Sequence, residues 1–109
     1  MLRHLTKMLV PQLGIAVIAL VSTTAAQSAA ELYKTKCIGC HGADGSGSTP
    51  AGKKLGARDL RSDKVQKQSD AELFTTMAKG KNKMPAFTKK LTDEQMLALV
   101  AYIRELVKK

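Results

Sequence analysis

The chain has 109 residues, of which 18 are lysine or arginine and nine are aspartate or glutamate, so its net charge at pH 7 is +9. This length suits one compact domain and leaves no room for a second. Only two cysteines are present and 4% of the residues are aromatic, which argues against a disulfide-rich scaffold and against a nucleic-acid-binding module.

The N-terminal segment has the pattern of an export signal. Arg3 and Lys7 form a positively charged start, residues 13–21 form an apolar stretch, and small residues follow. The uninterrupted apolar run is far shorter than the ~20 residues that a membrane-spanning helix needs. We therefore expect a cleaved signal peptide and no stable membrane insertion of the mature protein.

The expected cleavage site defines the domain organisation. Small residues at the required spacing permit cleavage after Ala26 or as late as Ala30. We therefore divide the chain into a signal peptide, residues 1–26, and a domain, residues 27–109, which is exported to the periplasm or, alternatively, to the thylakoid lumen or another extracytoplasmic compartment. The mature chain carries sixteen basic and nine acidic residues, a net charge of +7, which predicts an acidic partner.

The pattern after the signal is helical, and no region alternates as a strand would. A short helix is expected from about Ala30 to the region of Cys37. Residues 42–67 are rich in Gly, Ser and Lys and show no sustained period, so they are predicted to form a long loop.

Two further helices are predicted from their capping boxes. Ser69 with Glu72 begins a short amphipathic helix that ends at Gly80. Thr92 with Gln95 begins the last helix, which continues through Val107. A basic loop joins the two helices. The fold class is therefore all-α.

Residues 37–41 read Cys-Ile-Gly-Cys-His, the attachment pattern for covalent haem. On a helix, positions i, i+3 and i+4 face the same way. Cys37 and Cys40 can therefore bond the two vinyl groups while His41 binds the iron as an axial ligand. One covalent haem c would also supply the stabilising link that a mature domain of about 80 residues needs.

Two alternatives explain this motif less well. A Cys-x-x-Cys redox dithiol of the thioredoxin type would need a strand-rich fold, which the sequence does not predict. A structural zinc site needs four cysteine or histidine ligands. The mature chain offers only three such residues, because the other histidine, His4, lies in the signal.

The sixth iron ligand is expected to be Met84. Met77 and Met96 lie on the apolar faces of predicted helices, where methionine ordinarily fills the core. Met84 instead precedes Pro85 in a loop, where an extended backbone lets the thioether project towards the haem. A His/Met pair raises the reduction potential and leaves no open position on the iron, so we expect an electron carrier and no enzyme.

Several residues are assigned supporting roles. Pro50 is a candidate for the backbone carbonyl that orients the second nitrogen of His41. Arg58 or Arg61 is a candidate partner for a haem propionate. A ring of lysines around the haem edge would steer an acidic redox partner; these are Lys53, Lys54, Lys79, Lys81, Lys83, Lys89 and Lys90.

Nearly all of the mature chain closely resembles class I cytochromes c. The resemblance is carried by the motif at residues 37–41, the Met-Pro loop at Met84, and the final helix with Leu-Val-Ala-Tyr-Ile-Arg at residues 99–104. It implies a fold in which the N- and C-terminal helices cross, with a short middle helix, around one haem. Tyr33 would then pack against residues 99–103.

Two segments are similar to different branches of that family. Residues 80–87, Gly-Lys-Asn-Lys-Met-Pro-Ala-Phe, look like the axial loop of small photosynthetic cytochromes from algae and cyanobacteria. Residues 42–47 and 53–60 fit a broader bacterial periplasmic type. The resemblance implies a monomeric single-electron carrier that serves a dehydrogenase, an oxidase or a membrane complex; a haem subunit bound permanently to a larger oxidoreductase is the alternative.

Overall fold

The computed structural model describes residues 27–109 together with Gly14, so the predicted signal peptide lies outside the described residues apart from this glycine. Six helices follow in chain order: α1 (Ala29–Lys36), α2 (Ile38–His41), α3 (Pro50–Leu55), α4 (Asp63–Gln66), α5 (Asp70–Lys79) and α6 (Asp93–Leu106). Residues 27–109 contain no strand, only an isolated bridge between Lys81 and Met84. The all-α prediction is confirmed.

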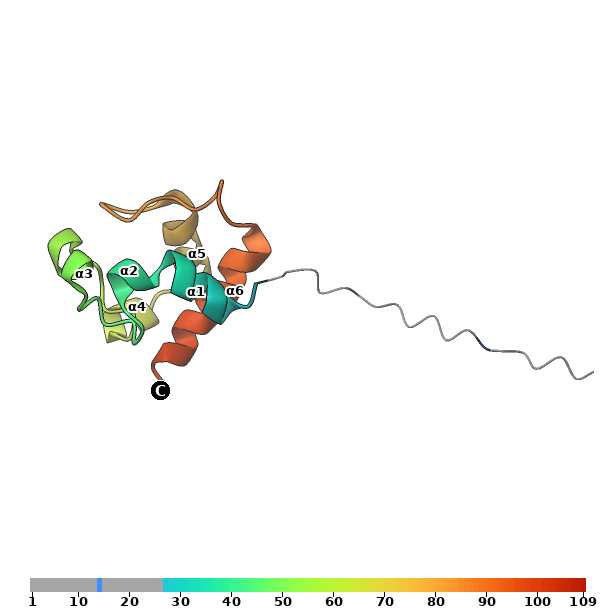
Figure 1. The fold of residues 1–109 in the computed structure, drawn as a ribbon, viewed down its shortest axis with the longest axis horizontal. Helices are drawn as coiled ribbons and strands as arrows, with labels where there is room; N and C mark the ends of the chain where they lie inside the picture. Colours follow the sequence, from blue (N-terminus) through green and yellow to red (C-terminus); the bar gives the residue numbers. More distant parts are fainter. Residues whose placement is uncertain (1–13, 15–26) are drawn as a thin grey trace, which may run out of the picture.

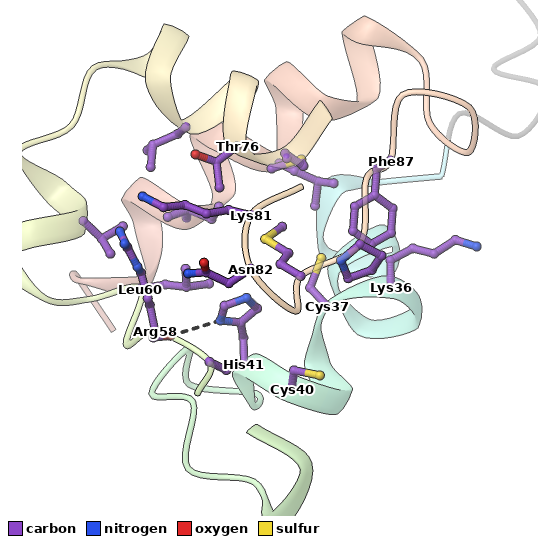
Figure 2. A pocket seen from close by; sticks show the side chains of 18 of the residues that line it. Lys36, Cys37, Cys40, His41, Arg58, Leu60, Thr76, Lys81, Asn82 and Phe87 are labelled. Carbon is purple, nitrogen blue, oxygen red and sulfur yellow. Dashed lines mark hydrogen bonds between the residues drawn. The ribbon is translucent and has the colours of Figure 1, made fainter. Parts of the chain in front are cut away.

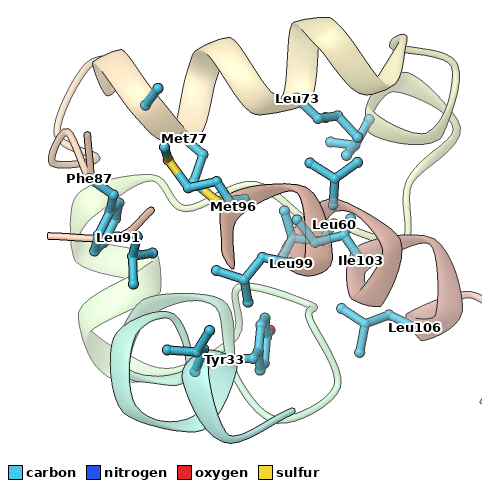
Figure 3. Close-up of a cluster of buried hydrophobic side chains, with 14 residues drawn as sticks. Tyr33, Leu60, Leu73, Met77, Phe87, Leu91, Met96, Leu99, Ile103 and Leu106 are labelled. Carbon is cyan, nitrogen blue, oxygen red and sulfur yellow. The ribbon is translucent and has the colours of Figure 1, made fainter. Parts of the chain in front are cut away.

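Helix α1 crosses α6, and α5 packs against α6 as well (Figure 1). The Tyr33 ring lies 4.9 Å from the ring of Tyr102, centroid to centroid, which confirms the expected contact between Tyr33 and residues 99–103. The two terminal helices and α5 enclose one cluster of buried apolar side chains (Figure 3). Met96 and Leu99 are fully buried at its centre, so Met96 fills the core as predicted.

Both predicted capping boxes are present. The Ser69 side chain accepts a hydrogen bond from the Glu72 backbone N–H, and the Glu72 side chain accepts one from the Ser69 backbone. Thr92 and Gln95 form the same reciprocal pair. Each box satisfies N–H groups that the first turn of a helix leaves without a partner, which fixes where α5 and α6 begin.

The prediction of one long loop over residues 42–67 is wrong, because α3 and α4 lie within it. Each begins at a hydroxyl cap: Thr49 accepts from the Gly52 N–H, and Ser62 accepts from the Val65 N–H. With six and four residues, these helices are too short to show a 3.6-residue period. The first predicted helix is also interrupted, since α1 ends at Lys36 and the attachment motif forms α2.

Arg104 joins α6 to the segment between α4 and α5. Its guanidinium donates to the Asp70 carboxylate at 3.0 Å, to the Gln66 backbone carbonyl at 2.9 Å and to the Gln68 backbone carbonyl. The side chain is about three-quarters covered, and only a planar guanidinium offers this many fixed donors. These bonds hold the final helix to the start of α5.

Replacing Arg104 with alanine is expected to lower the free energy of unfolding by about 1–3 kcal/mol, because two backbone carbonyls lose a charged donor. Urea unfolding of the haem-loaded protein measures the change. Lys108→Ala is the matched control: it removes only the exposed Lys108–Glu105 pair and should change stability by less than about 1 kcal/mol. Equal effects for the two variants would contradict the assigned role of Arg104.

Candidate haem site

The four residues predicted to hold haem line one pocket, although two segments more than forty residues apart supply them. Cys37, Cys40 and His41 come from α2 and its start, and Met84 comes from the loop after α5. The empty space in the pocket is about 1180 Å³, with the open solvent at its mouth included. Figure 2 shows Cys37, Cys40 and His41 together on one side of this space.

The walls suit a flat apolar macrocycle. Most of the pocket is lined by apolar side chains from α4, α5, α6, the segment before α4 and the loop after α5, among them Leu60, Val65, Leu73, Met77, Phe87, Leu99 and Ile103. No aspartate or glutamate is among the lining residues. A site of this composition can exclude water from a bound haem.

The backbone presents the attachment motif in a helical register despite the break between α1 and α2. The Cys37 N–H donates to the Tyr33 carbonyl at 2.9 Å, and the His41 N–H donates to the Cys37 carbonyl at 2.9 Å. Cys37 and Cys40 are half-buried and form no disulfide. Burial raises the pKa of the Cys37 thiol to about 11, so this cysteine is held as the neutral thiol in the absence of a covalent bond.

His41 has one ring nitrogen engaged and one available. Its Nδ1 lies 3.0 Å from the backbone carbonyl oxygen of Arg58 (Figure 2). Burial lowers the pKa of His41, partly offset by this hydrogen bond, so the neutral ring with a proton on Nδ1 is favoured. Nε2 is then the nitrogen with a free lone pair, which is the form that binds a metal.

The proposed role of Pro50 is therefore wrong. The carbonyl that orients His41 belongs to Arg58, and Pro50 instead occupies the first position of α3. The fixed backbone of proline suits that first position, where no N–H bond is needed. The sequence could not distinguish between carbonyls of the same loop, because every residue carries one.

Two residues near the motif have roles that the sequence reasoning missed. The Thr49 hydroxyl donates to the carbonyls of Gly39 and Cys40, at 2.7 and 3.1 Å, while it also caps α3. Gly52 packs so closely that a Cβ there would lie 2.1 Å from the Cys40 carbonyl oxygen. Helix α3 therefore holds the last turn of the attachment helix in place. A threonine before Pro50 is a recognisable helix start, but nothing in the sequence indicated its hydrogen bonds to the carbonyls of the attachment motif.

Met84 and Met77 both line the pocket, whereas Met96 does not. Met77 is on α5 and is buried in the core, as predicted. Met84 is half-buried in the loop after α5. The structure thus brings Met84 to the same pocket as His41, and it places a second thioether in the pocket wall.

A protein-family model described as "Cytochrome C oxidase, cbb3-type, subunit III" matches residues 24–103. The chain belongs to the class I c-type cytochromes. It is 34% identical to a cytochrome c6 of Thermosynechococcus vestitus in an alignment 96 residues long that covers 83% of each chain. This cytochrome therefore carries one covalently bound haem c and functions in electron transfer.

Solved structures agree with this assignment. The c-type cytochrome KustC0563 has a TM-score of 0.67 and 36% identity, over 72% of this chain and 96% of the other. A reducing HAO-like protein complex of Kuenenia stuttgartiensis, Kustc0457/Kustc0458, has a TM-score of 0.64 and 26% identity, over 72% of this chain and 42% of the other. The crossed-helix fold of class I cytochromes is thus confirmed. No helix among the described residues has the length and apolarity that crossing a membrane requires.

The two candidate arginines differ in their surroundings. Arg61 pairs with the Asp59 carboxylate at 3.1 Å, lies 3.9 Å from Asp44 and does not line the pocket of this cytochrome. Hydrogen bonds from Arg61 hold the pKa of Asp59 below its usual value. Arg58 lines the pocket and forms no ion pair among the described residues. Of the two, Arg58 is the arginine within reach of a group in the pocket.

The mouth of the pocket is positively charged. Four cationic residues line the pocket, namely Lys36, Arg58, Lys81 and Lys83, and none of them forms an ion pair among residues 27–109. The three lysines are exposed, so their charges lie at the mouth of the pocket. The other predicted ring lysines, Lys53, Lys54, Lys79, Lys89 and Lys90, are exposed but do not line the pocket. Unpaired charges at the mouth leave a positive electrostatic potential over this part of the surface.

Proposed function

We propose that this cytochrome is a diffusible single-electron carrier outside the cytoplasm, with haem c attached to Cys37 and Cys40 and its iron between His41 and Met84. The observation that carries the proposal is the convergence of these four side chains on one apolar pocket. Bound haem would supply the ferrous/ferric couple. The protein supplies the ligands, the covalent link and the exclusion of water.

Each protein group has a role in this function. The Arg58 carbonyl fixes the ring of His41 and favours the tautomer whose Nε2 can coordinate metal. A thioether ligand favours ferrous iron and raises the reduction potential, as does an apolar pocket. With both axial positions filled there is no place for a substrate on the iron, so we propose that this chain is no enzyme.

The start of α1 supports cleavage of the signal after Ala26. Ser28 caps α1 by accepting a hydrogen bond from the Glu31 N–H at 3.2 Å. Cleavage after Ala30 would remove this cap together with the first two residues of the helix. We therefore propose Gln27 as the first residue of the mature protein, released into the periplasm.

The charged mouth supports an acidic redox partner that binds transiently to the monomer. Small redox ions are suitable probes of this field. In the variant Lys81→Glu with Lys83→Glu, we expect electron transfer to the anion hexacyanoferrate(III) to slow by about tenfold at low salt and transfer from the cation hexaammineruthenium(II) to accelerate. High salt should remove most of both changes, because it screens exposed charges.

Stopped-flow kinetics of the haem-loaded protein measures these rates. The variant Lys64→Glu with Lys108→Glu is the control, since it changes the net charge equally at positions outside the pocket lining. If the control alters the rates as much as the mouth variant does, net charge alone governs the encounter. The proposal that the partner binds at the charged mouth would then be wrong.

A second candidate function is that of a haem subunit bound permanently to a larger oxidoreductase. The description of the matching family as an oxidase subunit favours it. Size-exclusion chromatography of native periplasm distinguishes the two. Elution as a small monomer supports the diffusible carrier, and co-elution of all the haem protein with a large enzyme would exclude it. Absorption spectra of the purified protein, oxidised and reduced, test the haem and its ligation in either case.

A further inference from the structure

The loop that carries Met84 is a tight hairpin closed by two backbone hydrogen bonds. The Lys81 N–H donates to the Met84 carbonyl at 3.2 Å, and the Met84 N–H donates to the Lys81 carbonyl at 2.9 Å. Only Asn82 and Lys83 lie between them, so the conformation of these two residues determines where the Met84 backbone lies. The position of its thioether follows from that backbone.

The hairpin is anchored to α5 on both sides. On the far side, the Phe87 N–H donates to the Met77 carbonyl at 3.0 Å, and the Thr88 N–H donates to the Ala78 carbonyl at 3.2 Å. On the near side, Gly80 has a φ of 75°, and a Cβ there would lie 2.6 Å from the Met84 carbonyl oxygen. The hairpin therefore folds back onto the end of α5, and little freedom is left outside the turn itself.

Asn82 has a backbone conformation that most residues avoid. Its φ is 54°, and it is the one non-glycine residue with a positive φ in the part of the chain that the structure describes. Asparagine tolerates positive φ better than other side chains, and glycine tolerates it best. A positive φ at the first central residue is also what the tightest hairpin turns require.

The side chain of Asn82 has no role that the structure makes visible. Asn82 is exposed and lines the pocket. Figure 2 shows its side chain between those of Lys81 and His41, and its amide forms no hydrogen bond with the other residues drawn there. We therefore attribute the role of asparagine at this position to its tolerance of a positive φ and not to its amide group.

We propose that Asn82 is a positioning residue for Met84: its positive φ closes the hairpin and thereby holds the thioether against the haem. The inference rests on the proposed role of Met84 as an iron ligand. An alanine at position 82 resists the turn, because its Cβ crowds the backbone at positive φ. The hairpin then opens more often, and each opening releases Met84.

The test compares two variants that both remove the amide, Asn82→Ala and Asn82→Gly. The first readout is the rate at which imidazole displaces the native ligand in the ferric, haem-loaded protein. We expect this rate to rise about tenfold in Asn82→Ala and to stay within about threefold of the wild-type rate in Asn82→Gly. The second readout, amide hydrogen exchange at the Met84 N–H, should show the same order without depending on ligation.

Three results would overturn the inference. If both variants speed displacement equally, the amide is what matters. If neither does, the turn does not control Met84. If exchange at the Met84 N–H is unchanged in Asn82→Ala, the hairpin is not held by position 82. Failure of the underlying ligand assignment would appear separately, because the wild-type ferric spectrum would then lack the sulfur-to-iron band before any substitution is made.

Discussion

Replacing Met84 with alanine is expected to convert the ferric protein from low-spin to high-spin, with loss of the sulfur-to-iron absorption band. Without the thioether, one axial position loses its strong ligand and ferrous iron loses its preferred partner. The reduction potential should fall by roughly 0.2 V, a fraction of the ~0.8 V range over which axial ligands set haem potentials. Absorption spectroscopy and a redox titration measure the two effects.

Met77 provides the matched control, because its sulfur also belongs to the pocket wall. Met77→Leu keeps the apolar volume and removes only the sulfur, so the band and the spin state should be retained. An unchanged spectrum in Met84→Ala would refute the axial assignment. Loss of the band in Met77→Leu, with Met84 intact, would instead identify Met77 on α5 as the axial ligand.

The second large effect is expected at the attachment cysteines. In the variant Cys37→Ala with Cys40→Ala, no haem should remain on the polypeptide after denaturation, whereas the wild-type mass should include one haem. Stability should fall as well, since a domain of this size depends on a filled pocket and a covalent link. Intact-mass spectrometry under denaturing conditions and thermal unfolding measure these changes.

The single variants give a finer prediction. Cys37→Ala and Cys40→Ala should each retain one thioether bond between the remaining cysteine and the haem. The haem should therefore stay attached, but each variant protein should unfold at a lower temperature than the wild type. Ser69→Ala controls for a general loss of stability, because it removes the α5 cap at a distance in sequence from the motif and should leave haem attachment complete. Full haem retention in the double variant would contradict attachment through these cysteines.

The sequence was sufficient where one short pattern determines one local structure. The capping boxes at Ser69 and Thr92 placed the starts of α5 and α6 correctly, because the cap residue and its partner three positions later are both visible in the sequence. The class of cofactor followed from five residues at 37–41 for the same reason. In both cases the interacting groups are neighbours along the chain.

The sequence was insufficient where the interacting group is distant along the chain or is a backbone group, which no residue type identifies. The hydrogen-bond acceptor for His41 is a backbone carbonyl 17 residues away. Every residue has such a carbonyl, so the sequence does not identify this one. Helices α3 and α4 are too short for periodicity, although their caps at Thr49 and Ser62 are ordinary ones. The hairpin around Met84 depends on the φ of Asn82, and asparagine at a turn predicts such a φ only once the turn itself is known.

His41 is the proposed iron ligand, and the bond from its ring to the Arg58 carbonyl affects its electronic character without changing which residue binds the iron. Because the acceptor belongs to the backbone, any substitution that shifts the segment around Arg58 changes how strongly the imidazole N–H is polarised. The reduction potential can therefore be adjusted in small steps through residues that never touch the haem. A lineage of such proteins could match new electron donors and acceptors while every iron ligand stays the same.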